Sequence, residues 1–259
     1  MSSLELSKAL DAYVKPTYFP LAVAVSKSDE IPPKLRRPSR DLGKKIAICQ
    51  AFAIARRYGW GLALQKEDIS CPPAKLAFGF EPSIDYYEEG TICVGLYTRD
   101  KEAGKRCEAC VPKFSFEEIK TILMAPIGKE TFEPQLYVFY GNSAQVLRLL
   151  NGRLYNTGGG LTSQINGRID CADIIIRTLK EDECQVVLPC YGDRLFGQTQ
   201  DWEMIFTIPQ SKVEVVIEGL EGTHKGGTRY PIPSFLRYEP EFPPLYMEME
   251  KIWEEKRKK

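Results

Sequence analysis

The stretch CADIIIRTLKEDECQVVLPC, residues 171–190, predicts the fold more directly than any other part of the sequence. Cys171 opens a segment with the apolar spacing of a helix, which runs to about residue 182. Residues 184–190, CQVVLPC, read as a short buried strand, and Pro189 ends it because proline has no backbone N–H to donate. The stretch therefore predicts one helix and one strand, with a cysteine at the start of the helix and Cys190 just past the strand.

The same order occurs in the first half of the chain. Cys49 opens a predicted helix over 48–58, a strand follows in WGLALQ (60–65), and Cys71 comes next in SCPP. Cys49 and Cys71 are 71 − 49 = 22 positions apart, against 190 − 171 = 19 for the second pair. The recurrence indicates a tandem duplication of a β-α-β-β-α unit.

We therefore expect a single α+β domain with a mixed β-sheet, followed by a C-terminal extension. The domain should span 1–235, with related halves at about 15–127 and 128–235. Other strands are expected at PLAVAVS (20–26) and GTICVGLYT (90–98), and a helix is expected to begin at Ser115 with Glu118 completing a capping box. The extension, 236–259, should carry an amphipathic helix in LYMEMEKIWEEKRKK.

The composition excludes several classes of function. Thirty-five basic and thirty-five acidic residues among 259 give a formal charge of zero, so no global field attracts nucleic acid or an anionic membrane. No apolar run approaches the roughly 20 residues needed to cross a bilayer, and the N-terminus lacks the pattern of a signal peptide. We therefore expect a cytoplasmic protein with no nucleic-acid or membrane partner.

Eight cysteines and a single histidine, His224, direct attention to thiol chemistry. Because the cytosol keeps thiols reduced, these cysteines should serve metal ligation, redox chemistry or plain burial rather than disulfides. Four of them lie at predicted element boundaries among polar residues, where free N–H groups at helix starts should lower the thiol pKa. A twofold relation between the halves would bring these four together: Cys49, Cys71, Cys171 and Cys190.

Four converging thiolates suit a [4Fe–4S] cluster, or less readily a tetrahedral zinc ion. The spacing is not diagnostic, because none of the four belongs to a C-x-x-C pair. The one such pair, Cys107 and Cys110, lies in a charged loop and reads equally as a ligand pair or an incidental one. Cys93 and Cys184 read as small buried apolar residues.

Two loops suggest a rival function. Gly158, Gly159 and Gly160 in NTGGGLTSQ can expose backbone N–H groups to an anion, although a flexible turn is the simpler interpretation. In LPCYGDRLFGQTQDWEM (188–204), Arg194 is assigned to neutralise a thiolate centre or an anionic ligand, and Asp193 to hold Arg194 or to cap the turn. The alternative for Asp193 and Arg194 is a surface ion pair.

The sequence resembles an uncharacterised family, domain of unknown function 169, also labelled the archaeal conserved region family. The motifs that carry the resemblance span about residues 5–235 and include ICQAFAIARR, DISCPPAKLAFGF, TGGGLT, CADIII and LPCYGDRLFGQTQDWEM. The resemblance implies cysteines at the positions of the four selected above, and it implies no reaction.

The leading hypothesis is a redox metal-centre protein that binds [4Fe–4S], in electron transfer or as part of an anaerobic enzyme. Two alternatives remain open: a non-metal module for an anionic small ligand at Gly158–Gly160 and Cys190–Arg194, and a thiol enzyme using Cys190 or Cys71. The expected partner is a redox protein or a small anionic ligand, and a homo-oligomer is left open.

Overall fold

The computed structural model describes residues 3–231, 242 and 244–258. Its centre is a six-stranded sheet in the order β2-β3-β1-β4-β6-β5, and every neighbouring pair of strands is antiparallel. The strands are β1 (Leu21–Ser26), β2 (Leu62–Leu64), β3 (Thr121–Pro126), β4 (Leu136–Gly141), β5 (Gln185–Val187) and β6 (Met204–Pro209).

The fold is α+β, as predicted, but the prediction of a mixed sheet is wrong. A strand-helix-strand order is typical of parallel strands, and β1 and β2 do run in the same direction because each is antiparallel to β3. However, β3 lies between them, so they never pair. The same holds for β4 and β5, which flank β6. Helical segments do connect β1 to β2 and β4 to β5, but the strands that they connect are not neighbours in the sheet.

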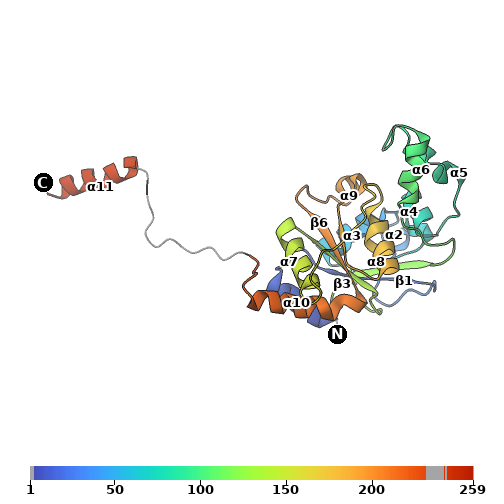
Figure 1. Ribbon diagram of the computed structural model, residues 1–259, viewed down its shortest axis with the longest axis horizontal. Helices are drawn as coiled ribbons and strands as arrows, with labels where there is room; N and C mark the ends of the chain where they lie inside the picture. The colour runs from blue at the N-terminus through green and yellow to red at the C-terminus, as the bar shows by residue number, and fades with distance from the viewer. Residues whose placement is uncertain (1–2, 232–241, 243, 259) are drawn as a thin grey trace.

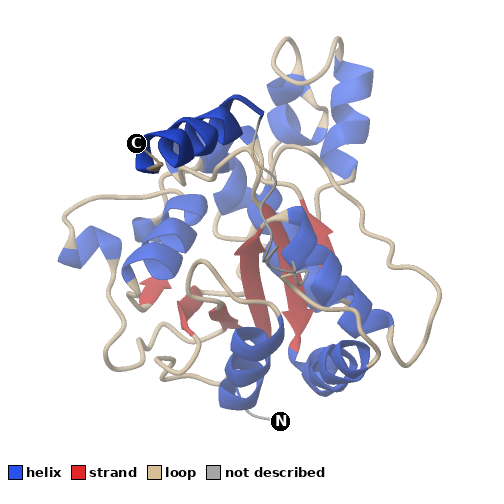
Figure 2. Ribbon diagram, turned by 90° about the vertical axis from the view of Figure 1, so that its left-hand side faces the viewer, coloured by secondary structure: helices blue, strands red, loops and turns tan. Residues whose placement is uncertain are grey.

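Both faces of the sheet are buried, which explains why its long strands are apolar at consecutive positions. Alternate residues of one strand enter different cores: Val23 packs with α3 (Ile48–Tyr58), whereas Ala22 packs with the helices of the opposite face. In β4, Val138 packs into the core on the α3 side of the sheet, and Tyr137 packs into the core on the opposite side. The structure therefore has three layers, with helices on each side of the sheet (Figure 2).

Different helices cover the two faces of the sheet. The face with the cysteines is covered by α3, α4 (Pro72–Ala77) and the π-helical turn η3 (Ala172–Arg177), which continues into α8 (Thr178–Glu181). The opposite face is covered by α1 (Ser3–Tyr13), α7 (Ser143–Leu154) and α10 (Val213–Lys225). The remaining helical elements are α2 (Pro38–Asp41), η1 (Lys66–Asp68), α5 (Asp85–Glu88), η2 (Thr91–Cys93), α6 (Lys101–Ala109), α9 (Tyr191–Phe196), η4 (Gln210–Lys212) and α11 (Pro244–Arg257).

Two local predictions fail between β2 and β3. The segment 90–98 is not a strand but the turn η2 and a loop, which lie between α5 and α6 in a part that projects from the body (Figure 1). The charged stretch after it is the helix α6, which begins where the Asp100 side chain accepts a hydrogen bond from Ala103 N at 2.9 Å. The N-cap therefore favours a helix in this segment, whose weak apolar pattern did not predict one.

The helix predicted to begin at Ser115 is also wrong, although half of its capping box forms. Ser115 N donates to the Glu118 carboxylate at 2.7 Å. No helix follows, because Thr121–Pro126 is buried throughout and pairs with β1 and β2 as strand β3. Pairing with two strands prevails here over a local helix signal.

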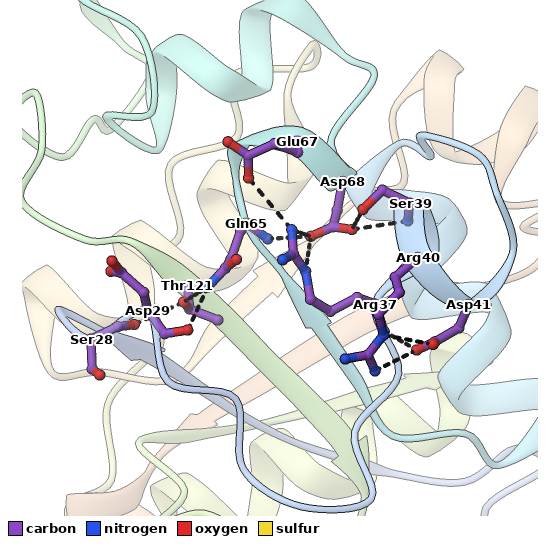
Figure 3. A network of polar contacts seen from close by, with 10 residues as sticks. All are labelled: Ser28, Asp29, Arg37, Ser39, Arg40, Asp41, Gln65, Glu67, Asp68 and Thr121. Carbon is purple, nitrogen blue, oxygen red and sulfur yellow. Dashed lines mark hydrogen bonds and ion pairs between the residues drawn. The ribbon is translucent and has the colours of Figure 1, made fainter.

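A buried carboxylate fixes the chain on the approach to α4 (Figure 3). Asp68 is fully buried, and it accepts hydrogen bonds from Arg37 Nε, Ser39 N and Gln65 N, each at 2.9 Å, and from Ser39 Oγ at 2.5 Å. Burial alone would raise the pKa of Asp68, but these donors outweigh it, so the pKa is lowered. The network holds the loop before α3 against the segment that leads to Cys71.

The described residues contain no helix whose length and hydropathy would allow it to cross a membrane. The expected C-terminal helix is confirmed as α11, and none of its side chains is buried. The predicted boundary at 235/236 lies outside the described residues.

Candidate functional site

The four selected cysteines each lie at the start of a helical segment. Cys49 is the second residue of α3, and Cys171 directly precedes η3. Cys71 and Cys190 occupy the positions before α4 and α9. Pro72 and Pro73 begin α4, where the missing N–H of proline costs nothing. The sequence places Cys71 and Cys190 after strands, and the structure adds that a helix begins at each.

A short backbone bridge brings the first two cysteines together. Ile46 N donates to Asp68 O at 2.8 Å, and Ser70 N donates to Ile46 O at 2.8 Å. This pairing lies just before Cys49 in one segment and just before Cys71 in the other. The Asp68 network therefore supports the position of both thiols.

One carboxylate joins the other two cysteines. Asp170 is 4 % exposed, and it accepts hydrogen bonds from Cys171 N at 2.8 Å and from Cys190 N at 3.0 Å. The Cys190 thiol also donates to it at 3.2 Å. The single side chain of Asp170 thus fixes the backbone at two cysteines that are 190 − 171 = 19 positions apart in the sequence.

A close contact between α3 and α9 joins the two pairs. The Cys49 thiol donates to Gly192 O at 3.6 Å. At Gly197, just past α9, an added Cβ would lie 2.1 Å from Asp193 Oδ1 and 3.0 Å from Cys49 O. A side chain at Gly197 would therefore collide first with Asp193 of α9, and it would also crowd the backbone of Cys49 in α3.

All four cysteines line one pocket of about 570 Å³. Ser70, Gln50, Arg168 and Asp170 contribute polar groups. Large apolar side chains make much of the remaining wall, and they come from α9 and from the loop between α5 and α6: Ile92, Leu96, Tyr97, Tyr191 and Phe196. The lining residues come from two stretches of the chain, 47–97 and 168–196.

The thiols of the pocket are held in the protonated form. Burial raises the pKa of Cys190 to about 12, and the nearby Asp170 carboxylate adds to the effect. Burial is also the largest cause of the raised pKa of Cys49, Cys71 and Cys171. The expectation that helix starts lower these pKa values is therefore wrong: loss of solvation outweighs the helix dipole.

Two buried carboxyls lie behind the cysteines. Asp193 is 1 % exposed and accepts a hydrogen bond from the Tyr140 hydroxyl at 3.2 Å. Burial, together with the charge of Asp170, raises the pKa of Asp193 to about 8, and burial also raises the pKa of Asp170. The two carboxyls therefore titrate as a pair, and both pKa values are raised because two buried carboxyls that share one site resist carrying two charges.

Arg168 is the basic residue that lines the pocket. Its guanidinium pairs with the fully buried Glu108, and Nη1 donates to Cys93 Sγ at 3.0 Å. The Arg168 guanidinium also lies near the rings of Tyr87 and Tyr97, 5.4 and 5.6 Å from their centroids. The ion pair joins the projecting α5–α6 part to the segment before Cys171.

The structure places the other predicted site residues away from the pocket lining. Arg194 does not line it; Nη1 contacts Gln200 O and the fully exposed Asp201 carboxylate, both at 3.2 Å. Asp193 is a buried neighbour of the site rather than a clamp for Arg194. Gly158, Gly159 and Gly160 are exposed, and among the described residues nothing beyond their chain neighbours lies within 4 Å of a Cβ built at any of them. The structure therefore does not bring the glycine loop and the cysteines together.

The remaining cysteines separate as the sequence suggests. Cys93 and Cys184 are fully buried, and all eight cysteines are free thiols. Cys107 and Cys110 lie on and just after α6 and do not line the pocket.

Sequence reasoning missed Arg168 and Asp170, which precede Cys171 in GRIDCADIII. A charged residue on each side of Ile169, immediately before an apolar helix, was the available signal. The apolar mouth at Leu96 and Tyr97 could not be found, because the segment was predicted to be a strand.

Comparisons with known proteins agree with the motifs. The model of the family described as "Uncharacterised ArCR", domain of unknown function 169, matches residues 9–219. A protein of Methanocaldococcus jannaschii named "Uncharacterized protein MJ0308" is 29 % identical over 204 residues, which cover 78 % of this chain and 86 % of that protein. No solved structure matches the chain. All four pocket cysteines fall within the matched range, and the chain belongs to the family of domain of unknown function 169.

Proposed function

We propose that Cys49, Cys71, Cys171 and Cys190 hold a [4Fe–4S] cluster and that the protein acts in electron transfer or as part of an anaerobic enzyme. The observation that carries the proposal is that four thiols from four separate segments line one pocket. Four cysteine thiolates are the ligand set that such a cluster takes. Asp170 and the Ile46–Ile69 bridge fix the backbone beside them.

The size of the pocket, about 570 Å³, suits a cluster better than a single ion. A zinc ion lies about 2.3 Å from each sulfur, so its four sulfurs crowd to about 3.8 Å from one another. Across the described ranges, no group of three or more His, Cys, Asp or Glu side chains is arranged to hold one metal ion. Sulfurs around a four-iron cluster are roughly 6–7 Å apart, which suits thiols spread around the wall of an open pocket.

The protonation of the thiols supports metal binding rather than thiol catalysis. A catalytic cysteine needs a lowered pKa, because the thiolate is the nucleophile. Burial raises the pKa of Cys71 and Cys190, the two candidate nucleophiles. Burial disfavours the negatively charged thiolate, and a bound metal cation stabilises it. Metal binding therefore displaces the thiol protons.

The strand order supports a duplicated origin for the site. The order β2-β3-β1-β4-β6-β5 is what a pseudo-twofold between β1 and β4 would produce if β2 corresponded to β5 and β3 to β6. Under this relation Cys49 corresponds to Cys171, and Cys71 to Cys190. We infer two related halves, each of which supplies two cysteines from equivalent positions.

The cellular setting follows from the same chemistry. Eight free cysteines suit a compartment that keeps thiols reduced, so we place the protein in the cytoplasm with a redox protein as its partner. The exposed apolar side chains around the pocket mouth, Leu96 and Tyr191 among them, offer such a partner a contact surface.

Iron and sulfide analysis after anaerobic reconstitution tests the proposal. The wild-type chain should bind about four iron and four sulfide per chain. Serine at any one of the four pocket cysteines should lower the iron content at least twofold. The matched controls, Cys107→Ser and Cys184→Ser, should keep the wild-type content. Equal iron content in pocket and control variants would overturn the assignment.

A further inference from the structure

We propose that Cys93 and Cys107 form a reversible disulfide by exchange with a low-molecular-weight disulfide, and that this bond fixes the rim of the cysteine pocket. The pair lies outside the proposed cluster ligands, so the inference does not depend on the cluster. Both cysteines are free thiols in this structure. Their bond would close a loop of 107 − 93 = 14 residue steps, which contains the rim residues Leu96 and Tyr97.

Two glycines bring the segments of these cysteines into backbone contact. A Cβ added at Gly104 of α6 would collide with the carbonyl of Gly90, and one added at Gly90 would collide with the backbone of Gly104. The two backbones approach this closely because neither residue has a side chain. Cys93 in η2 and Cys107 in α6 each follow one of these glycines by three residues, which is about one helical turn.

The two thiols share their neighbours. Cys93 Sγ donates to Glu108 Oε1 at 3.0 Å, and Glu108 is next to Cys107 on α6. Burial raises the pKa of Cys93 to about 11, the charge of Arg168 opposes this shift, and contact with the Cys107 side chain adds to it. Burial also raises the pKa of Tyr87, and both thiols add to that shift. Cys93 and Cys107 therefore lie side by side, as the partners of a disulfide must.

The exposure of the two thiols sets the order of the exchange. Cys107 is partly exposed and Cys93 is fully buried, so a dissolved disulfide meets Cys107 first. Cys107 loses its proton to water and attacks the small disulfide, whose S–S bond breaks. One small thiolate leaves and takes up a proton from water, and Cys107 carries a mixed disulfide.

Cys93 completes the exchange. It attacks the Cys107 sulfur, the bond between the two cysteines forms, and the second small thiolate leaves. The proton of Cys93 passes to this leaving thiolate. The cysteine pair thus loses two electrons and two protons, and the small disulfide gains them as two thiols.

Glu108 and Arg168 equip Cys93 for this second step. Glu108 Oε1 already accepts the hydrogen bond of the Cys93 thiol, so it can take the proton and transfer it to the leaving thiolate. Arg168 Nη1 donates to Cys93 Sγ at 3.0 Å, and its positive charge stabilises the thiolate. The ion pair between Arg168 and Glu108 holds both groups at the sulfur.

The backbone of Cys93 carries the rim of the cysteine pocket. Its carbonyl accepts hydrogen bonds from Leu96 N at 3.1 Å, Tyr97 N at 2.9 Å and Thr98 N at 3.0 Å. Leu96 and Tyr97 line the pocket and are exposed. A covalent bond from Cys93 to α6 restricts the opening of this loop, because a disulfide limits the conformations of the segment that it closes. Oxidation therefore holds the rim in place, and reduction releases it.

The test treats the full chain, purified anaerobically and reduced, with an excess of glutathione disulfide. Linked cysteines are mapped by mass spectrometry of peptides produced in acid, where disulfides do not rearrange. Cys93→Ser keeps a donor to Glu108, and Cys110→Ser removes the rival partner in the C-x-x-C pair. Cys184→Ser is the matched control, because Cys184 is fully buried in the core on the opposite face of the sheet.

The wild-type chain, Cys110→Ser and Cys184→Ser should link Cys93 to Cys107 in most molecules, and dithiothreitol should reverse the bond. Cys93→Ser should instead retain glutathione on Cys107, because the second thiol is missing. Hydrogen exchange of the amides in 94–98 should slow about fivefold or more when the wild-type chain is oxidised. The same treatment should leave this exchange unchanged in Cys93→Ser.

Three results would overturn the inference: a bond mainly between Cys107 and Cys110, no bond between Cys93 and Cys107, or unchanged exchange in 94–98 after the bond has formed. If Cys93→Ser does not fold, the wild-type map and Cys107→Ser still decide, since Cys107→Ser should leave Cys93 reduced. Iron content is not a readout, so failure here leaves the cluster proposal standing.

Discussion

The carboxylate of Asp170 should be the most sensitive position of the site outside the cysteines themselves. Replacement by asparagine keeps the shape of the side chain and leaves one acceptor oxygen where there were two. Oδ1 accepts from Cys171 N at 2.8 Å and from the Cys190 thiol at 3.2 Å, while Oδ2 accepts from Cys190 N at 3.0 Å. An amide NH₂ in either place would face a backbone N–H, so at least one bond to the backbone is lost.

The magnitude follows from that loss. A buried N–H left without an acceptor costs about 1–3 kcal/mol. Removal of the Asp170 charge beside Asp193 offsets part of this, because that charge raises the pKa of Asp193. The net fall in the free energy of unfolding should be about 1–2 kcal/mol, or about 2–8 °C in the melting temperature of a chain of this size.

Urea unfolding followed by circular dichroism measures the effect, with Asp201→Asn as the control. Asp201 lies in the loop that follows α9, and its side chain is fully exposed. Asp170→Asn should also weaken retention of iron by about tenfold or more, since groups that orient metal ligands have effects of this size. Unchanged unfolding and unchanged iron retention in Asp170→Asn would refute the role given to this carboxylate.

Three further changes test separate parts of the account. Cys190→Ala should abolish iron binding, whereas Cys184→Ala, a fully buried thiol outside the site, should cost about 1–3 kcal/mol in urea unfolding and keep its iron; similar iron content in the two would contradict the site. Asp68→Asn should lose about 1–3 kcal/mol at pH 7. Because the folded-state pKa of Asp68 is lowered, its stabilisation is present above the unfolded pKa of about 3.9 and is lost as pH falls through the folded value, so wild type and variant should converge in acid; a constant difference down to low pH argues against the carboxylate. Gly197→Ala should destabilise the chain by several kcal/mol or unfold it, since its Cβ would meet Asp193 and Cys49 backbone, whereas Gly160→Ala, with open space, should change the melting temperature little; equal melting curves would show that α3 and α9 do not need this contact.

The sequence predicts the elements of the sheet well where local patterns and tertiary packing agree. The helix over 48–58 is confirmed, as are the strands expected at 20–26 and 60–65, which are β1 and β2. Strand pairing could not be predicted in the same way, since a strand-helix-strand pattern sets the direction of two strands and not whether a third lies between them. In the sheet, β3 lies between β2 and β1, and β6 lies between β4 and β5. These positions depend on pairing between segments far apart in the sequence, which a short stretch of sequence does not reveal.

The candidate site was predictable for the cysteines and not for their surroundings. Element boundaries and the recurrence between halves select the four thiols that line the pocket. The direction of their pKa shifts depends on burial and on Asp170, which is known only once the chain is folded. The sequence suggests Arg194 because it lies near Cys190, but in the structure its guanidinium contacts Asp201 in its own loop.

X-ray absorption at the iron edge of the anaerobically reconstituted full chain tests the central claim most directly. The account predicts iron surrounded by about four sulfur atoms, with neighbouring iron atoms at about 2.7 Å, and loss of this signal in Cys171→Ser but not in Cys184→Ser. Iron bound mainly by oxygen or nitrogen, the absence of an iron–iron distance, or an identical spectrum from Cys171→Ser would contradict a four-iron cluster held by Cys49, Cys71, Cys171 and Cys190.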